Sequence, residues 1–316
     1  MTIQLSSSYT ALELFKTLIN QNKMILLDVR NKEDSKRINI ESPFPFKFKN
    51  IPYFDFIENE KMTIEKIPRG IPIKIICAKE GSANFVADIL IKYGFDDVAY
   101  LSGGINTWGN LLIPKRINLK SDPYKLYQFI RPGKASCSYG LIYNEKMVLF
   151  DPSRNYNFYN SFSKVNNAKI IRIYETHLQA DYISGSKIIA DYTGAKIYAH
   201  ENDFKKSSFN YNQLKNNEIY YIDKNGPRIS TLYSPGHTLG SVSYIIDEKY
   251  LLSGDTLFIS SIGRPDLGGK IKSWSKILYN TITDTIQKLD NNLYVLPGHY
   301  KNWSEANNKM ILIKKL

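Results

Sequence analysis

Four short motifs, each directly after a strand-like apolar run, constrain the fold of this chain more than any other feature. Each motif places a histidine or an aspartate where a strand gives way to a turn. Histidine and carboxylate groups gathered at strand ends are typical metal ligands, and three of the four histidines of the chain fall in these motifs. The motifs therefore predict a metal site; they are residues 175–182, 235–237, 254–255 and 297–299.

The length of 316 residues is large for a single hydrophobic core and suits two domains. No segment has the pattern of a signal peptide, and no apolar run approaches the roughly 20 residues of a membrane helix. Cys77 and Cys137 lie far apart, which argues against a disulfide framework and suits a reducing compartment. We therefore expect a cytoplasmic protein without membrane association.

The formal net charge of +12 raises the question of nucleic-acid binding. The lysines, however, are scattered singly through polar faces and do not form one stripe. Such scatter is typical of a solvated basic surface, so we expect no nucleic-acid partner. The positive charge would still attract small anionic substrates.

The N-terminal third alternates strand-like and helix-like segments. Apolar runs at 24–27, 71–76 and 98–101 predict buried strands, and apolar residues at helical spacing predict helices near 9–20 and 85–93. This alternation predicts a small parallel α/β sheet.

Cys77 opens a loop between the second of these strands and the helix after it. Backbone N–H groups at a helix N-terminus favour negative charge, so a cysteine there tends towards the reactive thiolate. Lys79 would act in the same direction and Glu80 in the opposite one. A free cysteine is also commonly a small buried apolar residue, and from the loop alone both interpretations stay open.

Three segments of this region together resemble the rhodanese (sulfurtransferase) domain, namely residues 27–30, the loop 77–82 and residues 101–108. The resemblance covers about residues 8 to 112 and implies that Cys77 carries a sulfane sulfur as a persulfide. Many rhodanese loops have an arginine at the position of Ser82, which argues against efficient use of thiosulfate as donor, whereas sulfur transfer from another persulfide needs less anion binding. The other loop residues expected to bind substrate are Lys79 and Gly81.

The composition changes after residue 112, which predicts a domain over 1–112, a polar, proline-flanked linker over 113–123 and a second domain over 124–316. The second domain has two strand-rich halves, each accompanied by helical patterns, including a helix over 271–289. Two such halves predict a four-layer αββα sandwich. The fold class is thus a parallel α/β domain followed by this sandwich.

The ordered motifs of the second domain resemble the metallo-β-lactamase superfamily over about residues 124 to 316. Within it they resemble persulfide dioxygenases, above all those fused to rhodanese domains, because of the segment 263–267 and the domain fusion. The motifs that carry the resemblance are Thr176-His177 with Asp181, then 235–238, 254–258, 263–267 and 297–299.

Members with two zinc ions usually have histidines at the positions of Gln179 and Tyr182, so each of the two metal sites has lost one ligand here. A two-metal hydrolase needs both ions, and thioester hydrolysis of the glyoxalase type is therefore disfavoured. The ligands that remain are His177, His237 and Asp255. Two histidines and one carboxylate are typical of non-haem iron(II) oxygenases.

The resemblance implies that these three residues hold one Fe(II) per chain, with zinc as the alternative metal. Ligating histidines are usually oriented by further hydrogen-bonding residues. The residues expected to orient the ligands, or to serve as alternative ligands, are Gln179, Asp181, Tyr182 and His299.

The expected reaction is oxidation of a low-molecular-weight thiol persulfide, such as glutathione persulfide, by dioxygen to sulfite and a thiol. Arg264 would contact the anionic end of the persulfide, and Cys77 would exchange sulfane sulfur with thiosulfate or another persulfide. Two other functions stay open, a zinc-dependent thioester hydrolase and a persulfide carrier that acts through Cys77. The resembling enzymes often form homodimers.

Overall fold

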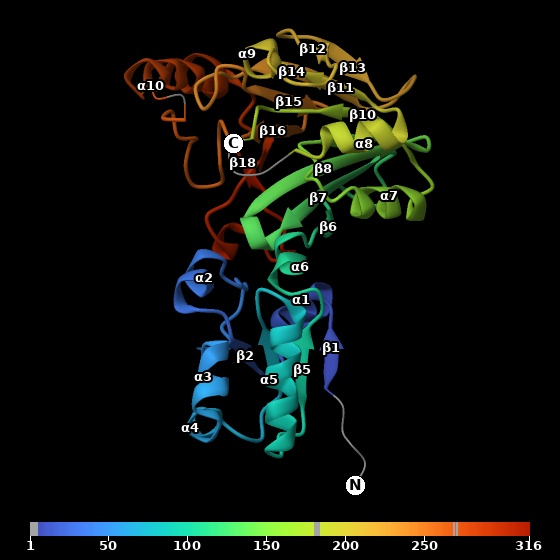
Figure 1. Ribbon diagram of the computed structural model, residues 1–316. Coiled ribbons are helices and arrows are strands. Elements are labelled where there is room, and N and C mark those ends of the chain that lie inside the picture. The colour runs from blue at the N-terminus through green and yellow to red at the C-terminus, as the bar shows by residue number, and fades with distance from the viewer. Residues whose placement is uncertain (1–5, 180–183, 268, 270) are drawn as a thin grey trace. The chain divides into compact units, whose positions relative to one another are not determined.

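A computed structural model describes residues 6–179, 184–267, 269 and 271–316, and in it the chain divides into two compact units. One unit contains the residues up to 111 together with 131–134, and the other contains 112–130 and 135–316. Figure 1 shows one sheet with helices in the first unit and two sheets with helices in the second.

The first unit is built on a five-stranded sheet of order β1-β5-β4-β2-β3, and each pair of neighbouring strands is parallel. This confirms the predicted parallel α/β domain. The strands are β1 (Ser7–Tyr9), β2 (Ile25–Asp28), β3 (Lys47–Asn50), β4 (Ile73–Ile76) and β5 (Val98–Leu101). The helices are α1 (Ala11–Ile19), α2 (Lys32–Arg37), α3 (Tyr53–Glu58), α4 (Glu60–Glu65), α5 (Glu80–Lys92) and α6 (Ile105–Gly109).

The core of this unit follows from the apolar runs of the central strands. All four residues of β2 and three of the four in β4 are buried, as expected when helices cover both faces of a parallel sheet. Helix α1 begins at a capping box, in which the Thr10 side chain accepts from the Glu13 N–H and Glu13 accepts from the Thr10 N–H. Short sequence patterns therefore account for the central strands and for the start of the first helix of this unit.

The second unit contains a seven-stranded sheet of order β12-β11-β10-β9-β8-β7-β6 and a six-stranded sheet of order β13-β14-β15-β16-β17-β18. The strands of the first are β6 (Ile113–Arg116), β7 (Lys125–Arg131), β8 (Ser136–Tyr143), β9 (Lys146–Phe150), β10 (Lys169–Tyr174), β11 (Lys196–Ala199) and β12 (Asn212–Gln213). Those of the second are β13 (Ile219–Tyr221), β14 (Arg228–Tyr233), β15 (Val242–Ile246), β16 (Tyr250–Gly254), β17 (Tyr294–Pro297) and β18 (Lys314–Lys315).

The two sheets pack face to face with helices on their outer faces (Figure 1). The Tyr244 ring of β15 lies 5.2 Å from that of Phe150 in β9 and 5.4 Å from that of Tyr174 in β10, so aromatic rings fill the space between the sheets. Tyr159 of α7 (Tyr156–Val165) and Ile189 of α8 (Ser186–Thr193) join the core on the outer face of the seven-stranded sheet. The predicted αββα sandwich is confirmed.

Residues 113–116, which we expected to belong to a linker, form strand β6 and pair with β7. Ile113 is buried, and this burial stabilises the segment as a strand. Pro114 has no N–H to donate, and β6 can accept it because it is the edge strand of its sheet.

The helix predicted over 271–289 is not continuous. It begins as α10 (Ile271–Asn280), continues as a π-helical turn over Thr281–Thr285 and ends as a 3-10 turn over Ile286–Lys288. The Thr281 hydroxyl donates to the carbonyl of Pro235 and the Thr283 hydroxyl to that of Tyr279. Threonine hydroxyls that bond to backbone carbonyls weaken the regular hydrogen bonds between residues four apart in a helix.

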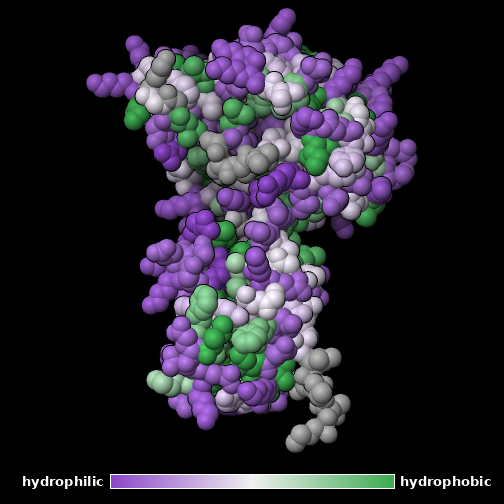
Figure 2. All heavy atoms as spheres, viewed as in Figure 1, coloured by the Kyte–Doolittle hydropathy of each residue, from purple (hydrophilic) through white to green (hydrophobic). Residues whose placement is uncertain are grey.

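Hydrophilic side chains cover most of the face of the molecule shown in Figure 2. Apolar side chains are more frequent over helices α3 to α5 of the first unit, where Phe54, Met62 and Phe85 are exposed. Within the described residues, no helix combines the length and the apolar character that a membrane crossing requires.

Candidate metal centre

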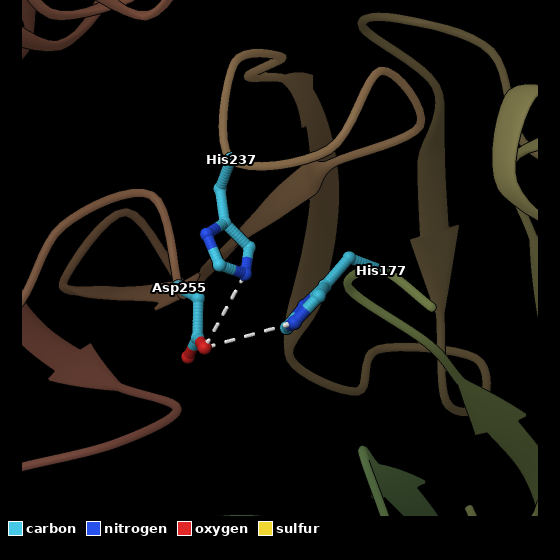
Figure 3. Close-up of side chains that lie close together, drawn as sticks. All are labelled: His177, His237 and Asp255. Atoms are coloured by element: carbon cyan, nitrogen blue, oxygen red, sulfur yellow. Dashed lines mark ion pairs between the residues drawn. The ribbon is translucent and has the colours of Figure 1, made fainter. Parts of the chain in front are cut away.

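The structure brings together His177, His237 and Asp255, the three residues for which the sequence predicts a metal site. Their ligand atoms all lie within 4.8 Å of one another, and all three residues are buried. The Nε2 atoms of the two histidines lie 3.7 and 3.6 Å from the same oxygen, Oδ2 of Asp255 (Figure 3). Two nitrogens and one carboxylate oxygen therefore converge on one point.

The order of the strands explains this convergence. Strand β15 is antiparallel to both β14 and β16, so β14 and β16 run in the same direction. Strand β17 is parallel to β16. The loops that carry His237, Asp255 and His299 after these strands consequently lie at the same edge of the sheet. His177 reaches this edge from the end of β10 in the facing sheet.

The hydrogen bonds of Thr176 determine which nitrogen of His177 is free. The Thr176 hydroxyl donates its only proton to Oδ2 of Asp151, at 2.8 Å, and its oxygen lies 2.8 Å from His177 Nδ1. Because that proton is already committed, His177 Nδ1 must be the donor in the second bond. The neutral ring then has an unprotonated Nε2, which is the atom that faces Asp255.

His237 adopts the same tautomer, with the proton on Nδ1, through a different partner. Its Nδ1 lies 2.9 Å from the backbone carbonyl oxygen of Arg264. A carbonyl can only accept, so Nδ1 carries the proton and Nε2 keeps its lone pair. Both histidines are thus fixed in the tautomer that binds a metal through Nε2.

The charges of the site also suit a cation. Burial lowers the pKa of His177 to about 4 and outweighs the attraction of Asp255 for a proton on the ring. Burial alone would raise the pKa of Asp255, but the hydrogen bond from His299 and the neighbouring histidines lower it to about 2. At neutral pH the site therefore has a neutral His177 and a negative Asp255, which are the protonation states of metal ligands.

His299 contacts the oxygen of Asp255 that faces away from the other histidines. Its Nδ1 lies 2.8 Å from Asp255 Oδ1. Gly298 makes this approach possible, since a Cβ at that position would lie 2.5 Å from Asp255 Oδ1. His299 therefore orients the carboxylate, which is one of the two roles that the sequence predicts for it.

The other residues expected to orient or replace ligands are less well described. Gln179 is half-buried, and its Oε1 has no hydrogen-bond partner among the described residues. Asp181 and Tyr182 lie outside the described residues. Among those that the structure describes, the histidine, cysteine and carboxylate groups that could hold a metal form the single cluster of His177, His237 and Asp255.

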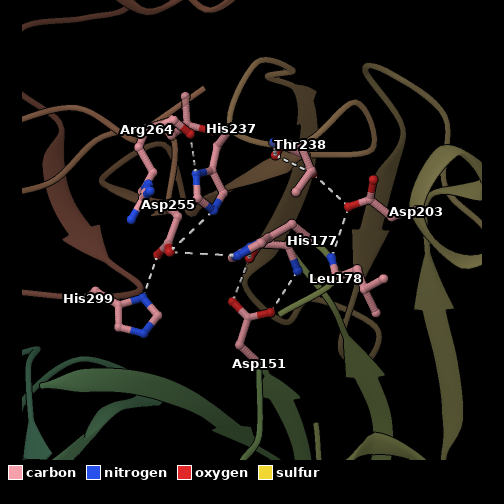
Figure 4. Close-up of polar contacts among 12 residues, drawn as sticks. Asp151, His177, Leu178, Asp203, His237, Thr238, Asp255, Arg264 and His299 are labelled. Atoms are coloured by element: carbon pink, nitrogen blue, oxygen red, sulfur yellow. Dashed lines mark hydrogen bonds and ion pairs between the residues drawn. The ribbon is translucent and has the colours of Figure 1, made fainter. Parts of the chain in front are cut away.

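The Arg264 side chain lies at the rim of the site and is exposed (Figure 4). Its Nε and Nη2 donate to the two carboxylate oxygens of Asp266 at 2.6 and 2.5 Å. Its backbone carbonyl, in contrast, orients His237. The cleft in front of the ligands is otherwise walled by apolar side chains, which are Phe258, Ile262 and Leu267.

Sequence reasoning missed the role of Asp151. Its Oδ1 accepts from the Thr176 N–H at 2.7 Å, while Oδ2 accepts from the Thr176 hydroxyl (Figure 4). Asp151 directly follows β9, so it is another carboxylate at a strand end. Its position at a strand end was the signal that the sequence offered. Its partner Thr176 is 25 positions away, so the contact itself could not be predicted from a local pattern.

In the first unit, Cys77 follows β4 and precedes α5. Its side chain is buried, and its carbonyl accepts from the Ile105 N–H at 2.9 Å. Glu80 uses its carboxylate to accept from the Gly103 N–H at 2.7 Å. The loop is therefore tied to the turn before α6; of the other predicted loop residues, Lys79 and Gly81 are exposed and Ser82 is half-buried.

Comparison with known proteins gives two family matches along the chain. The family model of the metallo-beta-lactamase superfamily matches residues 132–299, and that of the rhodanese-like domain matches residues 11–111. The first match begins at residue 132, just before β8, and ends at His299, so it includes the three clustered ligands.

Individual relatives cover about half of the chain. A probable metallo-hydrolase, YqgX, of Bacillus subtilis is 29% identical over 180 residues, 51% of this chain and 83% of that protein. A hydroxyacylglutathione hydrolase of Dictyostelium discoideum is 29% identical over 165 residues, 49% of this chain and 58% of that protein. A crystal structure of a metallo-beta-lactamase from Staphylococcus aureus is similar with a TM-score of 0.53 and 26% identity, and the match covers 56% of each chain.

Proposed function

This chain belongs to the metallo-β-lactamase superfamily and has a rhodanese-like domain N-terminal to its metallo-β-lactamase domain, and we propose that it is an iron-dependent persulfide dioxygenase. The observation that carries the proposal is the ligand set. His177 and His237 present Nε2 lone pairs, and Asp255 presents Oδ2, at one buried point.

Two imidazoles and one carboxylate are the ligand set typical of non-haem iron(II) oxygenases. Iron(II) bound there would supply the redox chemistry by which dioxygen oxidises the terminal sulfur of a thiol persulfide. The balanced reaction is RSS⁻ + O₂ + H₂O → RSH + SO₃²⁻ + H⁺. The ligand residues would keep their protonation state throughout, because Thr176 and the Arg264 carbonyl hold both Nδ1 protons.

The cleft suits a substrate whose reactive end is small and anionic. Phe258, Ile262 and Leu267 line it, so the walls beside the reacting sulfur are apolar. Arg264 is the cation at the rim, and it contacts substrate in this proposal after its pair with Asp266 opens. Water screens exposed ion pairs of this kind, and they contribute little, so a bound anion can replace Asp266 at little cost.

Cys77 is proposed to accept or deliver the sulfane sulfur in the rhodanese-like unit. It stands at the start of the loop before α5, where backbone N–H groups favour a negatively charged sulfur. Lys79 is exposed on the same loop. Since no arginine stands at Ser82, a persulfide donor is proposed in preference to thiosulfate.

A second candidate function is a zinc-dependent thioester hydrolase, because the chain is similar to a hydroxyacylglutathione hydrolase. Such two-metal chemistry needs a second ion beside the first. The described residues form one three-residue ligand cluster, and His299 Nδ1 is engaged with Asp255. The positions at which two-zinc members usually have histidines hold Gln179 and Tyr182 here, and this replacement supports the dioxygenase.

The deciding measurement is the metal content of the full chain purified without added metal, together with oxygen uptake in the presence of glutathione persulfide. We expect about one iron per chain and oxygen consumption that produces sulfite. Zinc at about two per chain, with thioester cleavage and no oxygen uptake, would contradict the proposal.

Two variants separate the dioxygenase from a persulfide carrier with a weakly catalytic second domain. His237→Ala should abolish oxygen uptake. Cys77→Ser should leave oxygen uptake with free glutathione persulfide unchanged and abolish sulfur transfer to an acceptor thiol. If only Cys77→Ser has an effect, the carrier function is correct.

A further inference from the structure

One carboxylate outside the ligand cluster bonds to both loops that carry the metal-binding histidines. Asp203 lies in the short helix α9 (Glu201–Phe204), directly after β11. Its carboxylate accepts hydrogen bonds from Leu178, the neighbour of His177, and from Thr238, the neighbour of His237 (Figure 4). Asp203 is thus an anchor common to two ligands that are 60 residues apart in the sequence.

Both oxygens of the carboxylate are used. Oδ2 accepts from the Leu178 N–H at 2.9 Å and from the Thr238 hydroxyl at 2.6 Å. Oδ1 accepts from the Gly240 N–H at 2.8 Å. Hydrogen bonds to a charged acceptor are stronger than those between neutral groups. Asp203 lies outside the ligand cluster, and its donors come from the two loops, so it acts on the loops that carry the ligands.

The surrounding residues are shaped to hold Asp203 at this position. Gly240 has no side chain, and a Cβ there would lie 2.5 Å from Cγ of Asp203. The loop is further tied to α9 through the carbonyl of Leu239, which accepts from Asn202 Nδ2 at 3.2 Å and from the Tyr233 hydroxyl at 2.7 Å. The contact between Asp203 and the His237 loop is therefore close and specific.

We propose that Asp203 is a positioning residue of the metal centre, which sets the separation of His177 and His237 before a metal binds. The proposal depends on the metal centre and not on the reaction it performs. A backbone bond from the Val242 N–H, at the start of β15, to the Thr176 carbonyl at 2.7 Å also joins the two sheets beside these loops. Removing Asp203 is thus expected to loosen the histidines without separating the sheets.

The test is metal binding by the full-length apoprotein, measured with Co²⁺ in competition with a chromophoric chelator. Loss of residues that orient ligands typically weakens metal affinity by about 10- to 100-fold, and we expect this loss for Asp203→Ala. Asp203→Asn keeps one amide oxygen and should lose less. Glu201→Ala removes an exposed carboxylate from the same helix and should bind Co²⁺ like the wild type.

The visible absorption spectrum of bound Co²⁺ separates positioning from a purely structural role. Positioning predicts an altered spectrum and weaker binding in Asp203→Ala, because the angle between the two histidine ligands is no longer fixed. A structural role predicts a lower melting temperature with the affinity and spectrum of the wild type, and that result would overturn the proposal. If the alanine variant does not fold, Asp203→Asn and Gly240→Ala are judged by the same two readouts.

The outcome is independent of the proposed reaction. Co²⁺ affinity is measured without turnover, so the chain can fail as a dioxygenase while Asp203 still positions its histidines. Conversely, oxygen uptake by the wild type with unchanged Co²⁺ binding in Asp203→Ala would support the reaction and refute the role of Asp203.

Discussion

His299 donates a hydrogen bond from Nδ1 to Oδ1 of Asp255 at 2.8 Å, and this bond leaves Oδ2 of the same carboxylate to face His177 and His237. One oxygen of the carboxylate therefore bonds to the orienting residue His299, and the other faces the candidate metal position. A ring that donates Nδ1–H to a carboxylate has no lone pair on that atom to offer a metal. Nδ1 of His299 therefore orients the ligand Asp255 and does not itself bind the metal.

The role of His299 can be tested by its removal. We expect His299→Ala to weaken metal affinity by about 10- to 100-fold, as for other residues that orient a ligand, while the limiting stoichiometry stays at one metal per chain. His200→Asn is the matched control, because His200 lies outside the ligand cluster and asparagine preserves its N-cap position. A drop from two bound metals to one would show instead that His299 is a ligand of a second ion.

Thr176 is predicted to determine the tautomer of His177. Thr176→Val keeps the shape but removes the hydroxyl that accepts from His177 Nδ1 and donates to Asp151. Metal affinity should fall by about 10- to 100-fold, and the unfolding free energy should fall by about 1–3 kcal/mol because buried polar groups lose partners. Thr176→Ser keeps the hydroxyl and should restore both quantities in chelator competition and urea unfolding.

The buried His177 should make the metal-free protein sensitive to acid. Its pKa is lowered to about 4 by burial, whereas an exposed histidine titrates near 6.5. Between these values the unfolded chain binds the proton and the folded chain does not, so stability falls as the pH falls from about 6.5 towards 4. From pH 7 to 4.5 this contribution amounts to about 2 kcal/mol.

His177→Gln should remove that part of the pH dependence. The measurement is urea unfolding in the presence of a chelator at both pH values, for the wild type and the variant. Equal losses of stability in the two proteins would show that His177 takes up a proton in the folded state.

Gly104 is predicted to be essential for the position of the Cys77 loop. Its φ of 68° and ψ of −169° form a conformation almost restricted to glycine, and a Cβ would lie 2.6 Å from the carbonyl oxygen of Ala78. Gly70 has a similar φ of 73°, and a Cβ added there would meet no atom within 4 Å, so Gly70→Ala measures the backbone strain alone, about 1–2 kcal/mol. Gly104→Ala should cost more and should also slow sulfur transfer through Cys77; equal effects of the two changes would contradict this.

Local sequence patterns were sufficient for most of the fold. Apolar runs and helical spacing predicted β2, β4 and α5, and the strand before each histidine motif was correctly expected. Strand β6 was missed because its pattern contains Pro114, which disfavours most strands but is tolerated at a sheet edge. The end of α10 was misplaced because the bond from Thr281 to the Pro235 carbonyl joins segments distant in the chain.

The sequence by itself determined the order of the motifs, the residue types of His177, His237 and Asp255, and the strands that precede them. These are local properties, since periodicity and turn residues act over a few positions. Only the tertiary structure decided which nitrogen of His177 and of His237 is free, and that Asp203 joins two loops. Each of these depends on hydrogen bonds between residues that are at least 25 positions apart in the sequence, and no local pattern encodes them.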